Sequence, residues 1–111
     1  MKYVFVDIIT GETFAIPRGI KYISNAADSI VSIGNENTCI SKPHCEIIYG
    51  GKGTPPMVQD CGSEHGTFIN GRSVIGRAPI RNEDILSLGD DDYYHPKKGA
   101  VYLKVVLIGG D

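Results

Sequence analysis

The sequence predicts an all-β fold, a β-sandwich of about ten to eleven short and mostly antiparallel strands. Three features lead to this class. Apolar and polar residues alternate over many short runs; glycine, proline and asparagine separate these runs at close intervals; and almost no segment has the 3.6-residue period of a helix. A chain of 111 residues is long enough for one hydrophobic core but not two, so we expect a single domain over residues 1–111.

Four strands are expected in the N-terminal part of the chain. The first alternates and places Val4, Val6 and Ile8 on one face. A turn at residues 10–12 leads back into the second strand, which Pro17 closes. The four strands are expected over residues 3–9, 13–16, 21–24 and 29–33.

Six further strands are expected downstream. Asn70-Gly71 is the strongest short hairpin signal in the chain and joins two of them. The last strand places alternate residues from Val101 to Leu107 on one face. Because the first and last strands are both long and apolar, we expect them to lie close together. The six strands are expected over residues 45–49, 57–60, 67–69, 73–75, 84–88 and 101–108.

Charge and cysteine content narrow the range of partners. The 11 basic and 13 acidic side chains give a net charge of −2 without a basic run, which argues against a nucleic-acid partner. No segment has the length of a membrane span, so no membrane partner is expected. Three cysteines without framework spacing favour free thiols in a reducing, intracellular compartment.

One stretch, residues 59–71, combines several residues that bend and fix a loop. Gly62 and Gly66 permit a positive φ or a close backbone approach. Asp60 and Ser63 have short polar side chains that bond nearby amides. The stretch is too polar for a core, and a rigid surface loop of this kind commonly presents a binding group.

Another loop lies upstream of this stretch, and the two together resemble a known family. The upstream loop reads Ser41-Lys42-Pro43-His44, a Ser-x-x-His motif before a strand. The stretch itself reads Asp-x-x-Ser-x-x-Gly-Thr-x-x-Asn-Gly over residues 60–71, and residues 82–89 complete the pattern. In this order and spacing the motifs resemble the forkhead-associated (FHA) domain family over nearly the whole chain.

The family's Gly-Arg element is not matched. If residues 29–33 form the strand that precedes the Ser-x-x-His motif, Ser24-Asn25 occupies the Gly-Arg position and Asn25 replaces the arginine. The alternative, Gly34-Asn35, lies too near Ser41 for that strand. Similarly, His65 stands where the family has asparagine.

The resemblance implies an intracellular module that binds phosphothreonine peptides of a partner protein, with nuclear placement taken from the family. Ser41 would donate to the phosphate, Lys42 would add charge, and His65 would bond the peptide backbone. Asn25 and Glu64 would also line the site. Structural roles in the loops would belong to His44, Ser63, Gly66, Thr67, Asn70 and Gly71.

The residues themselves leave two functions open. A phosphate carries nearly two negative charges and needs several donors, but Asn25 lacks the charged fork of arginine and Glu64 adds repulsion. The site is thus degenerate, and the alternative is an FHA domain that binds a partner or itself without phosphate. Ser41 bonded only to a neighbouring amide is the simpler structural reading of that residue.

Metal binding and catalysis are the remaining possibilities, and neither is expected. The cysteine and histidine spacings are not those of a structural zinc site. Ser41, His44 and Asp60 are of the types found in catalytic triads, but no nucleophile elbow is present. We expect no enzyme activity and no cofactor.

Overall fold

The chain folds as two packed antiparallel sheets, which confirms the predicted β-sandwich. The structure is a computed structural model and describes residues 2–109. One sheet has six strands in the order β2-β1-β10-β9-β6-β7, and the other has four in the order β3-β4-β5-β8. The strands are β1 Lys2–Asp7, β2 Thr13–Ala15, β3 Gly19–Ile23, β4 Cys45–Tyr49, β5 Met57–Asp60, β6 Thr67–Ile69, β7 Arg72–Ser73, β8 Arg77–Pro79, β9 Ile85–Leu88 and β10 Val101–Ile108.

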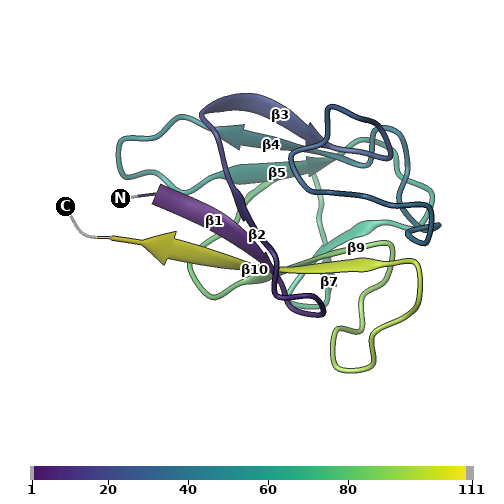
Figure 1. The fold of residues 1–111 in the computed structure, drawn as a ribbon. Coiled ribbons are helices and arrows are strands. Elements are labelled where there is room, and N and C mark those ends of the chain that lie inside the picture. The colour runs from purple at the N-terminus through teal and green to yellow at the C-terminus, as the bar shows by residue number, and fades with distance from the viewer. Residues whose placement is uncertain (1, 110–111) are drawn as a thin grey trace.

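The first and last strands pair with each other, as predicted. β1 runs antiparallel to β10 in the middle of the larger sheet, from Lys2 opposite Ile108 to Asp7 opposite Leu103 (Figure 1). The long connection before β4, residues 24–44, and the shorter loop after β5, residues 61–66, gather at the same end of the sandwich (Figure 1). This end holds the predicted ligand-binding residues Asn25, Ser41, Lys42, Glu64 and His65.

The core lies between the two sheets and follows the two-residue period of the strands. In β10 the predicted face is right: Val101, Leu103 and Val105 belong to the core. In β1, Tyr3 and Phe5 enter the core between the sheets, whereas Val4, on the opposite face, is also buried. The run Tyr-Val-Phe-Val is apolar at every position, so its periodicity did not reveal which face is inside.

The expected strand over residues 29–33 does not form. The Ser29 hydroxyl donates to the carbonyl of Val31 and accepts from the amides of Ser24 and Val31. Such local side-chain bonds give the backbone an alternative to a ladder. Val31 is nevertheless fully buried, so this loop contributes to the core without joining a sheet.

Two differences concern the segment after the Asn-Gly turn. β7 is Arg72–Ser73 instead of residues 73–75, because a two-residue turn sets the register at Ile69 opposite Arg72. The φ angles of Asn70 and Gly71 are 52° and 84°, as a type I′ turn requires. The short strand β8, Arg77–Pro79, was not predicted; its proline is tolerated because β8 is an edge strand.

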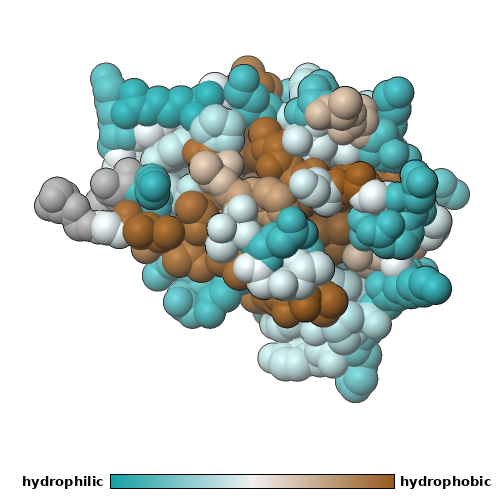
Figure 2. All heavy atoms as spheres, in the orientation of Figure 1, coloured by the Kyte–Doolittle hydropathy of each residue, from teal (hydrophilic) through white to brown (hydrophobic). Residues whose placement is uncertain are grey.

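The surface is mixed in character. Figure 2 shows hydrophobic atoms in a band across the middle of one face, between β3 and β10, with hydrophilic residues around the periphery. Isolated exposed apolar side chains also occur, including Ile9, Ile75 and Tyr94. Across residues 2–109, no helix has the length and apolar character needed to cross a bilayer.

Candidate functional site

Three segments converge at the loop end of the smaller sheet through main-chain hydrogen bonds. The amide of Asn25 donates to the carbonyl of Ser41 at 3.1 Å. The amide of His44 donates to Ile23, and its carbonyl accepts from Cys61, both at 3.0 Å. The segments that carry Asn25, Ser41 and the 61–66 loop are therefore neighbours, although up to 40 residues separate them.

The ring of His44 joins two of these loops. Its Nδ1 accepts from the Ser41 amide at 3.0 Å, and its Nε2 lies 2.9 Å from the Gly66 carbonyl oxygen. Because Nδ1 accepts from an amide, the proton is on Nε2, which donates to Gly66. The side chain is fully buried. The geometry thus requires one neutral tautomer.

The protonation state of His44 agrees with this geometry. Burial lowers the pKa of His44, and this outweighs the opposing effects of the Gly66 carbonyl and the nearby Asp60 carboxylate. The imidazole therefore stays neutral at pH 7.

Asp60 organises the second loop from its first position. One carboxylate oxygen accepts the amides of Gly62 and Ser63, and the other accepts the hydroxyls of Ser63 and Thr67, the last at 2.6 Å. The Ser63 hydroxyl in turn accepts the Gly66 amide at 3.0 Å. Partial burial raises the pKa of Asp60, but the bonds from Ser63 and Thr67 outweigh it and lower the pKa overall.

The Ser41 hydroxyl is fixed by the neighbouring loop. Its oxygen accepts the Glu64 amide at 3.0 Å, which leaves its proton available to a ligand. Ser41 is partly exposed, whereas Lys42, Glu64 and His65 are exposed. Asn25 is exposed as well. The structure therefore brings the five predicted ligand-binding residues to one end of the molecule.

The Asn70-Gly71 turn is held against the next strand. The side chain of Asn70 accepts the Ile85 amide at 2.9 Å and donates to Asp84 at 3.0 Å. The Asn70 amide donates to the Ile85 carbonyl at 2.8 Å. These bonds explain why asparagine, rather than any turn residue, occupies this position.

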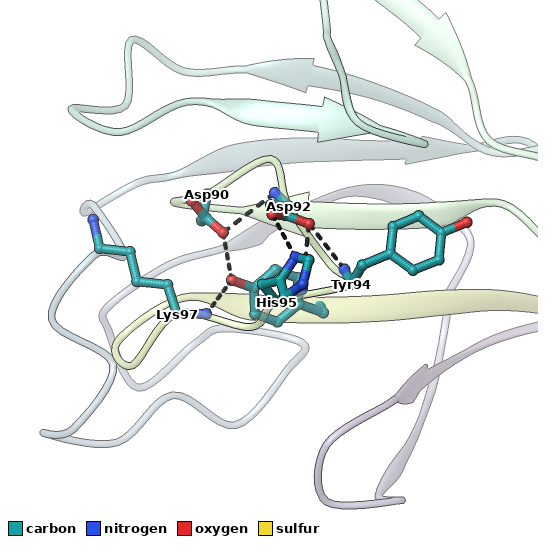
Figure 3. Close-up of polar contacts among 6 residues, drawn as sticks. Asp90, Asp92, Tyr94, His95 and Lys97 are labelled. Atoms are coloured by element: carbon teal, nitrogen blue, oxygen red, sulfur yellow. Dashed lines mark hydrogen bonds and ion pairs between the residues drawn. The ribbon is translucent and has the colours of Figure 1, made fainter.

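A third loop, residues 89–99, lies beside the site. The Gly89 amide donates to the Gly66 carbonyl at 2.9 Å, and the Gly99 carbonyl accepts the Cys39 amide at 3.0 Å. The sequence suggested a solvated acidic loop, but Figure 3 shows that its polar groups are bonded to one another. Asp90 accepts the Tyr102 hydroxyl at 2.8 Å, and that hydroxyl also accepts the Lys97 amide.

The contacts of this third loop shift the pKa values of two side chains. Burial, with the bond to Asp90, raises the pKa of Tyr102 to about 12, so the phenol stays protonated. Asp92 lies 3.0 Å from Nδ1 of His95, and this hydrogen bond lowers the pKa of Asp92. The ring of Tyr94 points away from this network, although its main-chain amide donates to Asp92 at 3.2 Å (Figure 3).

The residues of a catalytic triad are present but not arranged as one. His44 contacts Ser41 through the main-chain amide, not the hydroxyl, and Asp60 is engaged by Ser63 and Thr67. Among residues 2–109, no group of three histidine, cysteine or acidic side chains could hold a metal ion. The three cysteines are free thiols.

Sequence reasoning missed two parts of the site. It assigned Glu64 a side-chain role, but the atom that contacts Ser41 is the Glu64 amide, and no sequence pattern identifies a main-chain donor. It also omitted Asp84, the partner of Asn70. The signal for Asp84 was its place in the strand motif that follows the hairpin, which the prediction assigned only to the sheet.

Comparison with known proteins agrees with the architecture. The chain resembles an FHA domain solved in a study of phosphothreonine-dependent FHA interactions, with a TM-score of 0.76, 19% identity, and coverage of 98% of this chain and 99% of that one. It also resembles the N-terminal FHA domain of S. cerevisiae Rad53p, solved with a phosphothreonine peptide: TM-score 0.76, 14% identity, coverage 97% and 94%. At these identities the likeness shows the fold.

A third similar structure and the sequence model of the family point to the same assignment. The FHA domain of the CT664 protein from Chlamydia trachomatis gives a TM-score of 0.71 at 17% identity, with coverage of 98% of this chain and 100% of that one. A search of curated protein sequences finds no match. The sequence model of the FHA domain matches residues 24–89, more than half of the chain. The chain belongs to the FHA domain family.

Proposed function

We propose that this chain is a non-catalytic module that binds a phosphothreonine-containing segment of a partner protein. FHA domains are binding modules, and the similar Rad53p domain was solved with a phosphothreonine peptide. The observation that carries the proposal is the Ser41 hydroxyl, whose oxygen is fixed by the Glu64 amide and whose proton is free to donate.

The other polar groups of this end would complete the ligand contacts. Lys42 follows Ser41 directly and is exposed, so its ammonium group is available to a phosphate oxygen. Asn25 supplies an uncharged donor, and His65 supplies a ring nitrogen to the peptide backbone. The loops are held by the bonds of His44 and Asp60, so little ordering cost falls on the module when it binds.

A specific observation supports the second candidate, a degenerate site that binds without phosphate. Glu64 is exposed one position from His65, and Asn25, which the sequence comparison placed at the family's arginine position, is uncharged and exposed. A charged hydrogen bond contributes about 1.5–3 kcal/mol against about 1 for a neutral one. We therefore expect phosphate affinity about tenfold below that of a site with arginine.

Titration with a phosphothreonine peptide library, compared with the same peptides unphosphorylated, separates the two functions. The proposal requires phosphate-dependent binding that Ser41→Ala and Lys42→Ala each weaken by about tenfold. Ser73→Ala and Lys2→Ala are matched controls, because both residues are exposed and Lys2, opposite Ile108, lies at the end of β1 away from the candidate site. Equal affinity for both peptide sets, or no binding, would support the degenerate site instead.

The three free thiols support an intracellular location, since two of them, Cys39 and Cys45, are buried without a disulfide. Thiol labelling of the protein isolated from its own cells checks this. Three reactive groups after unfolding are expected, and a disulfide-linked form would contradict the proposal.

A further inference from the structure

The four-stranded sheet has one face that packs on the core and one that does not. In β4, Cys45, Ile47 and Tyr49 are buried, whereas Glu46 and Ile48 between them are only half-buried. Successive side chains of a strand point to opposite faces, so Glu46 and Ile48 mark the outer face. On the edge strand β3, Ile20 is 59% exposed on that face.

Strand register arranges the outward side chains in two straight rows. Each row crosses all four strands, with one residue from β3, β4, β5 and β8 in turn. The first row is Ile20, Ile48, Met57 and Pro79, and it is entirely apolar. The second is Tyr22, Glu46, Gln59 and Arg77.

Two copies of this face can pack against each other so that each row meets the same row of the other copy. The two-fold axis would lie between the two faces, parallel to the strands and midway between β4 and β5. It places β4 of one copy opposite β5 of the other, and β3 opposite β8. Isologous dimers need this property, in which one patch fits its own image. In the first row, Ile20 would then meet the partner copy's proline at position 79, and Ile48 its methionine at position 57.

The second row is complementary in charge and hydrogen bonding. The same axis brings the Tyr22 ring opposite the arginine at position 77 of the other copy, a pairing of an aromatic face with a cation. It brings the Glu46 carboxylate opposite the glutamine amide at position 59, an acceptor opposite a donor. No like charges face each other across the pair.

We propose that this chain self-associates face to face through the outer surface of β3, β4, β5 and β8. Standard strand spacing and rise give a face of roughly 19 by 17 Å, well below the roughly 800 Å² per partner of a stable interface, so only weak and reversible association is expected. We therefore expect a dimer with a Kd of about 10 µM to 1 mM.

The symmetry has a consequence that depends on the proposed function. An axis parallel to the strands keeps both loop ends on the same side of the dimer. Two candidate peptide sites, each containing Ser41, would then bind a doubly phosphorylated partner with higher affinity than either site alone.

Sedimentation equilibrium of the whole chain, from about 10 µM to 1 mM without peptide, tests the interface in the expected affinity range. The proposal expects a reversible monomer–dimer equilibrium that Ile48→Glu and Met57→Glu each weaken at least tenfold. Ile75→Glu is the matched control, because Ile75 is 89% exposed and lies outside this face. A wild-type chain that stays monomeric at 1 mM, or an equal effect of Ile75→Glu, would overturn it.

Two further measurements keep the test decisive if a variant misfolds. Amide chemical shifts of the wild-type chain on dilution should change along β3, β4, β5 and β8; changes confined to the loops or the six-stranded sheet contradict the proposal. Tyr22→Ala and Arg77→Ala should weaken association without additivity when combined. Because no peptide is present, failure of the dimer leaves the proposed peptide binding untouched, and the reverse also holds.

Discussion

His44 and Gly66 lie 22 positions apart in the sequence, and a hydrogen bond of 2.9 Å joins the ring of one to the carbonyl of the other. The same ring accepts the Ser41 amide from its other nitrogen. One buried imidazole thus fixes the distance between the loop that carries Ser41 and the loop that carries Glu64. The candidate site exists as a unit because of this connection.

Replacing His44 should loosen the two loops and destabilise the fold. His44→Gln leaves a buried amide or carbonyl without its partner, which typically costs about 1–3 kcal/mol. Urea unfolding at pH 7 measures the loss. His95→Gln is the control, because the His95 side chain is 85% exposed, and it should change the free energy of unfolding very little. Equal stability of the two variants would contradict the role assigned to His44.

The stability of the wild-type chain should fall in mildly acidic solution. The pKa of His44 is lowered in the folded state, so the unfolded chain binds more protons below the ordinary value of 6.5. The free energy of unfolding then decreases as pH falls from 6.5 toward the folded pKa. The lowered pKa of Asp60 adds a second decrease below 3.8.

Unfolding by urea at pH 7, 6 and 5 measures the histidine part of this dependence. His44→Gln should flatten the profile over this range, whereas His95→Gln should retain it. A profile that stays steep in His44→Gln would assign the pH dependence to another group.

Restoring the family's charge at position 25 should strengthen phosphate binding. Asn25→Arg adds a charged fork beside Ser41, and the gain in phosphothreonine-peptide affinity should be about tenfold. Asn35→Arg adds the same charge to an exposed position on the same connection and serves as the control. If both variants bind equally, net charge rather than position explains the effect, and the assignment of position 25 fails.

Removing one charge from Asp60 should release the second loop. In Asp60→Asn, an amide NH₂ faces hydroxyl and main-chain donors, so at least one of the four bonds is lost. We expect a loss of about 1–3 kcal/mol in unfolding free energy. Hydrogen exchange of the Gly62 and Ser63 amides should quicken, whereas Asp28→Asn, at an exposed position, should leave both unchanged.

Gly66 should tolerate no side chain, for two separable reasons. Its φ is +92°, and an added Cβ would lie 2.8 Å from Cζ of Phe68. Gly62 has a similar φ of +74° but no atom within 4 Å of an added Cβ. Gly66→Ala should therefore lower the melting temperature more than Gly62→Ala, and the difference measures the contact with Phe68. Equal effects would leave backbone strain as the sole cause.

The sequence was sufficient where the signal is local. Alternation over residues 45–49 and 101–108 predicts strands that form, because a half-buried strand must place apolar residues at every second position. Asn70-Gly71 predicts its turn because both residues adopt the positive φ that a type I′ turn needs. The Ser-x-x-His and Asp-x-x-Ser motifs likewise indicate two bent loops, because their short polar side chains bond nearby amides.

Tertiary structure decided what depends on partners distant in the chain. The apolar run in β1 is equally apolar on both faces, so only its pairing with β10 determined that Phe5 lies inside. Residues 29–33 have strand-like composition, but the Ser29 hydroxyl satisfies the local backbone, and although the Ile30 amide donates to Tyr22 of the edge strand β3, no ladder follows. The contact of the Glu64 amide with Ser41 spans 23 positions and uses a main-chain atom, which every residue but proline has. Side-chain chemistry can be read from a sequence, whereas the position of an amide depends on how the whole chain folds.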